Sequence, residues 1–187
     1  MKNLSEKIRQ ELPKLEQDLL VELFTIDCSA FGGEVYNLCN LVNEKNEPIT
    51  FGGIKYQPYP LEATGFAINS KGASNRPTLS LSNMFGLVTA LEAENKILGA
   101  VVWRKQVYAK FLDPINFIDG NPYADSQAVA VAEYRIEAVK SLNKNIATLE
   151  LAVPAESDGL KIPRRVIISN TSPSAFKKST GVLAYRG

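Results

Sequence analysis

The side chains that could carry acid–base chemistry in this sequence are carboxylates and two thiols, because the 187 residues include no histidine. Without histidine the chain lacks the commonest general base, and neither a Ser-His-Asp nor a Cys-His arrangement can be built from it alone. Glu133, Glu137 and Glu150 fall on strand-like segments, where carboxylate chemistry is conceivable. Glu133 and Glu137, however, share the polar face of one alternating strand, which favours a solvated surface.

Cys28 and Cys39 are the only cysteines. They fit reduced thiols of a cytosolic protein, and a disulfide between them requires that their strands be neighbours. Two thiols cannot complete a four-ligand Cys/His zinc site within one chain. The string Asp119-Gly120-Asn121-Pro122 brings polar oxygens together but consists of turn dipeptides. Phosphate loops, nucleophile elbows and EF-hand loops do not occur in the sequence. We predict no catalytic residue, no metal ligand and no enzymatic activity.

Composition and charge are those of an ordinary globular protein, with 45% hydrophobic residues, 22% charged residues and a formal net charge of +1. Six of the 21 basic residues follow Asp158, and no acidic residue does, so the C-terminal segment is basic. No apolar stretch approaches the roughly 18 residues of a membrane-spanning helix. The first residues lack the apolar core of a signal peptide, so we expect synthesis in the cytoplasm.

The hydrophobic pattern predicts two helices. Leu4, Ile8, Leu12 and Leu15 recur at helical spacing, which predicts an amphipathic helix over residues 3–17 with a kink or early end at Pro13. A second helix is expected over residues 84–98, with Asn83 as its cap and Gly99 as its stop.

The rest of the pattern predicts strands. Gly52-Gly53 should form a tight hairpin turn, and Asn143-Lys144-Asn145 should join a longer antiparallel hairpin. The predicted strands are Leu19–Cys28, Glu34–Cys39, Ile49–Phe51, Ile54–Gln57, Leu61–Asn69, Pro77–Asn83, Val101–Leu112, Val131–Val139 and Ala147–Val153. This density of short strands predicts a mainly β (α+β) fold, an antiparallel barrel or sandwich with an N-terminal and an internal helix.

Several stretches resemble the minor tail protein L family of long-tailed phages. The matching strings occur in one order from about residue 20 to about residue 171, and no one of them is a catalytic signature. They include Asn43–Pro48, Gln57–Pro60, Arg76–Leu79, Lys105–Asp113, Asn116-Phe117, Tyr123–Asp125 and Asp158-Gly159.

The resemblance implies an architectural role at the virion tail tip. Members of the family lie between the ring of distal tail protein and the central hub that carries the receptor-binding fibre, and they help convert sixfold into threefold symmetry. A homotrimer in the virion and a domain like those of tail-tube and hub subunits are therefore expected. We expect an N-terminal helix over residues 1–18, a β-barrel tail-tip domain over 19–158 and a basic, partly irregular segment over 159–187.

The sequence departs from the family near its C-terminus. Family members continue past the final Tyr-Arg-Gly into a cysteine-rich module that resembles a four-cysteine iron–sulfur site. Here Ser172 stands where a cysteine is expected, the segment Ser174–Val182 is unlike the family, and no cysteine follows Cys39. Because such clusters need about four thiolates, we expect this chain to bind no cofactor.

The basic segment supplies the candidate partner-interface residues, which are Lys161, Arg164, Arg165, Lys177 and Lys178. They could dock on an acidic neighbour or line a channel for exiting DNA, or they could belong to a solvated terminus. No interleaved aromatic residue indicates base stacking. Trp103, Tyr56 and Tyr59 motivate an alternative function, a receptor- or carbohydrate-binding β module at the tail tip, although packing roles are the simpler interpretation.

Overall fold

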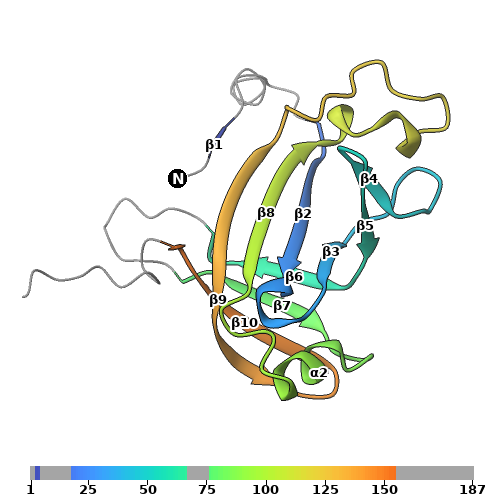
Figure 1. The fold of residues 1–187 in the computed structure, drawn as a ribbon. Coiled ribbons are helices and arrows are strands. Elements are labelled where there is room, and N and C mark those ends of the chain that lie inside the picture. The colour runs from blue at the N-terminus through green and yellow to red at the C-terminus, as the bar shows by residue number, and fades with distance from the viewer. Residues whose placement is uncertain (1–2, 5–17, 67–75, 155–187) are drawn as a thin grey trace, which may run out of the picture. The chain divides into compact units, whose positions relative to one another are not determined.

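The computed structural model describes residues 3–4, 18–66 and 76–154. Strands dominate these ranges, with one α-helix and three short 3-10 turns (Figure 1). The strands are β1 Asn3–Leu4, β2 Leu20–Asp27, β3 Val35–Cys39, β4 Ile49–Phe51, β5 Ile54–Pro58, β6 Leu61–Thr64, β7 Thr78–Ser82, β8 Val101–Tyr108, β9 Ala130–Leu142 and β10 Ile146–Ala152. The helix is α2, Leu87–Ala93, and the 3-10 turns are η1 Ser29–Phe31, η2 Ala109–Phe111 and η3 Pro114–Asn116.

The strands form one mixed sheet in the order β4-β5-β3-β2-β8-β9-β10-β7-β6, with β1 paired to the start of β9. Every pair is antiparallel except β3 with β5. In the described part of the chain β4 and β6 do not pair with each other, so the sheet is open. The mainly β fold with an internal helix is confirmed, whereas closure into a barrel stays a prediction.

Strand β9 joins the two halves of the sheet. Its residues Ala130–Arg135 pair with β8, and Arg135–Leu142 pair with β10 (Figure 1). Register shifts in β10 at Thr148/Leu149 and Glu150/Leu151 accompany this change of neighbour. Bulges of this kind let a strand bend so that the two parts of a sheet pack face to face.

Strand β2 is buried on both of its faces. Val21 and Leu23 belong to a smaller core cluster with β4, β5 and the end of β8, whereas Phe24 and Ile26 belong to a larger cluster with β7, β10 and α2. Leu23 faces the smaller cluster and the next residue, Phe24, faces the larger one, so the strand passes from one cluster to the other between them. A strand with a core on each face reads as a nearly continuous apolar run, as this one does.

The predicted hairpins are confirmed. Ile49–Phe51 pair with Ile54–Tyr56 around Gly52-Gly53, and both glycines have positive φ, 58° and 78°. Strands β9 and β10 form the second hairpin, in which the side chain of Asn143 accepts hydrogen bonds from the backbone N–H groups of Asn145 and Ile146.

Both helix predictions need revision. Asn3 and Leu4 pair with Val131 and Ala130 of β9, so a helix beginning at residue 3 is wrong for these two residues. Residues 5–17 lie outside the described ranges. The internal helix has seven residues rather than fifteen and begins after Gly86, whose left-handed φ of 68° ends the preceding turn.

Asn83 nevertheless organises the start of α2. Its side-chain oxygen accepts hydrogen bonds from the N–H groups of Val88 and Thr89, and its amide donates to the Asn143 carbonyl and the Thr89 hydroxyl. Asn83 is buried. The N-cap residue is Gly86, so the predicted cap position at Asn83 is wrong, although the Asn83 side chain does bond to the first turn of the helix.

Candidate interaction surfaces

The three predicted carboxylates lie on β9 and β10, and two of them form ion pairs. Glu133 and Glu137 are exposed. Arg76 lies 3.0 Å from Glu137 and 3.7 Å from Glu150, and Lys140 lies 3.4 Å from Glu150. Glu137 and Glu150 thus each lie beside a cation. The solvated face expected for Glu133 and Glu137 is confirmed.

The two thiols are buried, free and separated. Cys28 belongs to the larger core cluster and Cys39 to the smaller one. Burial raises the pKa of both thiols above the ordinary value of 9.0, and for Cys28 the nearby charge of Asp27 adds to the effect. Within the described ranges no three acidic or thiol side chains form a set that could hold a metal ion.

The side chain of Arg104, on β8, is buried where β2, β8 and β9 lie side by side. Arg104 pairs with Glu22, which also accepts a hydrogen bond of 2.8 Å from Gln106. The Arg104 guanidinium stacks 4.3 Å from the centre of the Phe66 ring, which forms a T-shaped pair with the ring of Tyr134. The guanidinium is therefore engaged within the fold by a carboxylate and a ring, while its buried Nε makes no hydrogen bond among the described residues.

The segment between β8 and β9, residues 109–129, is held rigidly against the β4–β5 hairpin. Asn116 is buried and exchanges two hydrogen bonds with the backbone of Thr50, at 2.6 Å and 2.8 Å. Asp113 accepts the N–H groups of Gly52 and Gly53. The outer edge of β4 is therefore occupied by side chains of this segment, which mimic a neighbouring strand.

The turn string within that segment behaves as predicted. Gly120 has a φ of 78°, and the Asn121 amide donates to the carbonyls of Lys110 and Leu112. The Asn121 amide therefore bonds to carbonyls of the same segment.

Large apolar side chains stand exposed on anchored turns, a feature that the sequence analysis did not single out. Phe85 is 85% exposed and Met84 is 76% exposed, directly after the buried Asn83. On the segment 109–129, Tyr123 is 72% and Ile118 is 68% exposed. In the sequence these residues appear only as apolar residues beside turn dipeptides. That pattern does not show whether their side chains are exposed or buried.

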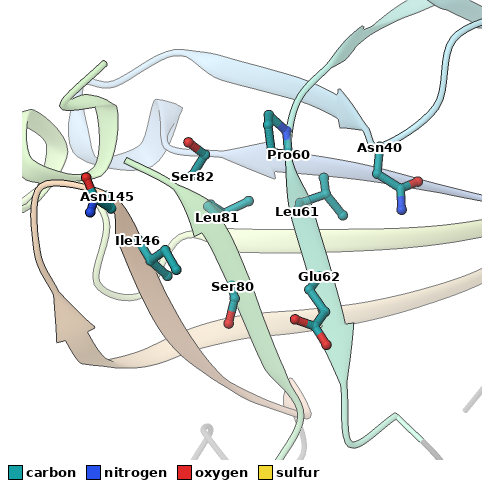
Figure 2. A pocket seen from close by; sticks show the side chains of 9 residues that line it. All are labelled: Asn40, Pro60, Leu61, Glu62, Ser80, Leu81, Ser82, Asn145 and Ile146. Carbon is teal, nitrogen blue, oxygen red and sulfur yellow. The ribbon is translucent and has the colours of Figure 1, made fainter. Parts of the chain in front are cut away.

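A groove of about 410 Å³ lies at one end of β6, β7 and β10. Figure 2 shows Glu62, Ser80 and Ile146 carried by these three strands, which lie side by side. Ile146 is 50% exposed and forms an apolar part of the lining. The nine lining residues are Asn40, Pro60, Leu61, Glu62, Ser80, Leu81, Ser82, Asn145 and Ile146.

The aromatic residues behind the carbohydrate-binding alternative do not line this groove. Tyr56 is fully buried and its hydroxyl accepts a hydrogen bond from Lys105, while the Tyr59 hydroxyl donates to the Ser82 carbonyl at 2.6 Å. Trp103 is half-buried on β8. The packing interpretation is confirmed for the two tyrosines, and the groove lends the alternative no support.

The predicted partner-interface residues Lys161, Arg164, Arg165, Lys177 and Lys178 lie outside the described ranges, so their role stays a prediction. No helix within the described part of the chain is long and apolar enough to span a membrane.

Comparison with known proteins decides the family. The family model described as "Phage minor tail protein L" matches residues 29–187. This chain belongs to the phage minor tail protein L family. It is also similar to Tail tip protein L of Escherichia phage lambda, with 42% identity over 178 residues that cover 95% of this chain and 77% of that relative.

Membership in the minor tail protein L family confirms the resemblance drawn from the short strings. It makes the chain a structural component of a phage tail. The match to the family model continues to Gly187, beyond residue 171 where the resemblance of individual strings ended. The segment Ser174–Val182, which the sequence analysis set apart, is therefore included in the matched region.

Proposed function

We propose that this chain joins the ring of distal tail protein to the central hub and fibre protein at the tail tip, as a homotrimer in the virion. The observation that carries the proposal is the 42% identity to a phage tail tip protein over 95% of the chain. Assembly takes place in the host cytoplasm, and the finished subunit stays in the virion without catalysing a reaction.

The surface of the described part supports a joining role. Segment 109–129 exposes Ile118 and Tyr123. Asn116 and Asp113 accept hydrogen bonds from the β4–β5 hairpin, and Asn121 donates to the segment's own backbone, so the segment is held in place. Apolar and aromatic side chains on a rigid loop lose little conformational freedom on binding, which suits the centre of a protein interface. The five C-terminal cations contribute by docking on acidic neighbours.

Co-purification tests the proposal. When the chain is co-expressed with the distal tail protein and the hub protein of the same phage, a complex containing all three should survive size-exclusion chromatography. Ile118→Lys combined with Tyr123→Lys should release at least one neighbour, whereas Ala93→Lys, which adds a cation at the exposed end of α2, should not. If the unaltered chain elutes free of both neighbours, the joining role is wrong.

Replacing the five cations by serine tests the C-terminal surface separately. The altered chain should fold and should bind its acidic neighbour more weakly, with a loss that grows smaller as salt concentration rises. Unchanged binding at low salt would show that these five residues are not part of the interface.

A further inference from the structure

The two ends of the sheet differ in how their outer edges are satisfied. At β4 the side chains of Asn116 and Asp113 bond to the strand and to the turn that follows it. At β6 the hydrogen bond from Ser82 N–H to the Pro60 carbonyl, 2.9 Å long, fixes which groups face β7. Because antiparallel pairs alternate between bonded and non-bonded positions, Glu62 and Thr64 turn their backbone groups toward β7.

It follows that Leu61 and Ala63 turn their N–H and C=O groups away from the sheet. Within the described residues no hydrogen bond reaches these four groups. Such a row of unpaired backbone groups is a template for one more strand.

The side chains of β6 specify what that strand must carry. Leu61 and Ala63 are half-buried against the larger core cluster, so the added strand continues this face with apolar side chains. On the other face Glu62 is exposed, and no cation of the described ranges lies within ion-pair distance of it. A lysine or arginine beside Glu62 complements this charge.

The groove indicates which side chain the added strand carries two places after the cation. In a strand that runs antiparallel to β6, the residue two places after the cation lies level with Pro60, where Pro60, Ser82 and Ile146 line the groove (Figure 2). A large apolar side chain at this place packs against Pro60 at the rim of the groove. The edge therefore fits an extended segment with the order cation, small apolar, large apolar.

A second copy of β6 does not meet this requirement. The antiparallel register that pairs Leu61 with Ala63 of the other copy, and so uses all the free backbone groups, sets Glu62 opposite Glu62. Like charges directly opposite each other destabilise a strand pair. Pro60 and the short length of β6 further discourage unspecific pairing at this edge.

We propose that the outer edge of β6 binds an extended strand of another tail protein, held by backbone hydrogen bonds at Leu61 and Ala63, by a cation beside Glu62 and by an apolar side chain against Pro60 at the rim of the groove. The inference rests on the proposed function only in naming a tail protein as the source of the strand.

Two synthetic peptides test the edge directly. One carries alternating valines with a lysine followed two places later by leucine, and the other has glutamate in place of lysine. The lysine peptide should bind the intact protein at least ten-fold more tightly than the glutamate peptide, and Glu62→Lys should reverse the preference. On binding, amide exchange should slow at Leu61 and Ala63. Equal binding of both peptides, or unchanged exchange, would overturn the proposal.

Ala63→Pro provides the backbone test. It removes an N–H that points out of the sheet, a place where an edge strand tolerates proline, so the variant should fold and lose the lysine peptide. Ala63→Ser, which keeps the N–H, is the matched control and should retain binding. A folded Ala63→Pro variant that binds the peptide as the parent does would contradict the assignment.

Co-purification separates this inference from the proposed function. If the neighbours co-purify with both the parent and Ala63→Pro, the joining role stands and the β6 edge is not the contact. If no neighbour co-purifies with the parent, the joining role fails, and the peptide experiment still judges the edge.

Discussion

The side-chain amide of Asn116 and the backbone of Thr50, 66 positions apart in the sequence, bond to each other twice. The carboxamide presents a donor and an acceptor in the same arrangement as a peptide group, so it completes the outer edge of β4. Its second donor hydrogen reaches the Asp113 carbonyl at 2.8 Å.

Asn116→Ala should therefore lower the free energy of unfolding by about 3 kcal/mol, because buried backbone groups lose their partners. Urea denaturation at neutral pH measures the change. Asn40→Ala, at an exposed asparagine, should stay within about 0.5 kcal/mol of the parent. Equal losses in the two variants would show that the Asn116 bonds contribute nothing specific.

Gly33→Ala should destabilise the protein by about 2 kcal/mol through steric overlap. A β-carbon at Gly33 would lie 2.6 Å from that of Cys28 and 3.2 Å from the Cys28 carbonyl oxygen. Gly53→Ala is the control, since an added β-carbon there meets nothing within 4 Å and only its φ of 78° is unfavourable, which costs about 1 kcal/mol.

Thermal and urea unfolding should show a larger loss of stability for Gly33→Ala than for Gly53→Ala. Cys28→Ala should not reduce the cost of Gly33→Ala, because it keeps the β-carbon. In a Cys28→Gly background, Gly33→Ala should cost less than it does in the parent. The reverse ranking would mean that the turn adapts more easily than its contacts indicate.

Stability should decline at alkaline pH because burial raises the pKa of the Cys28 and Cys39 thiols. A thiol whose folded pKa exceeds the unfolded value stabilises the fold fully below the unfolded pKa of about 8.5–9. This contribution disappears as pH rises through the folded pKa. The free energy of unfolding should fall above pH 9 by up to about 1.4 kcal/mol per pH unit for each thiol.

Urea denaturation at pH 7, 9 and 10 tests this slope. Replacing both cysteines with alanine should flatten the curve near pH 9 and leave the decline above pH 10, where Tyr36, Tyr59 and Tyr134, whose pKa values burial also raises, begin to ionise in the unfolded chain. A curve that is equally steep near pH 9 without the cysteines would refute the assignment.

Glu22→Ala should cost about 2–3 kcal/mol, because it leaves the guanidinium of Arg104 buried without its carboxylate. Removing both partners as Glu22→Ala with Arg104→Met should cost less than the single change. Glu94→Ala, which breaks a solvent-exposed pair with Lys96, should cost under about 1 kcal/mol. Additive losses at Glu22 and Arg104 in a double-mutant cycle would show that the two do not interact.

Local patterns predicted the local elements well. Glycine pairs and asparagine-rich turns located both hairpins, because turn chemistry acts over a few residues. The internal helix was overestimated because Leu87, Leu91 and Leu98 share a helical spacing, although the chain leaves the helix at Glu94 and the buried Ile97 packs from a turn.

Long-range relationships were not accessible from the pattern. The parallel pairing of β3 with β5 and the sharing of β9 between two halves of the sheet depend on contacts distant in sequence. The hydrogen bonds between Asn116 and Thr50 likewise join residues that are far apart in the sequence. Nothing in the alternation of Leu61–Thr64 showed that this strand lies at the end of the sheet, so the candidate edge could be recognised only from the strand order.

Strand β2 has a consequence for how the molecule comes apart. Its first half supports one cluster of buried side chains and its second half supports the other, so loss of β2 from its place between β3 and β8 would open both clusters together. The described domain should therefore melt as a single cooperative unit, and a mechanical load applied at one end is transmitted through this strand to the opposite end.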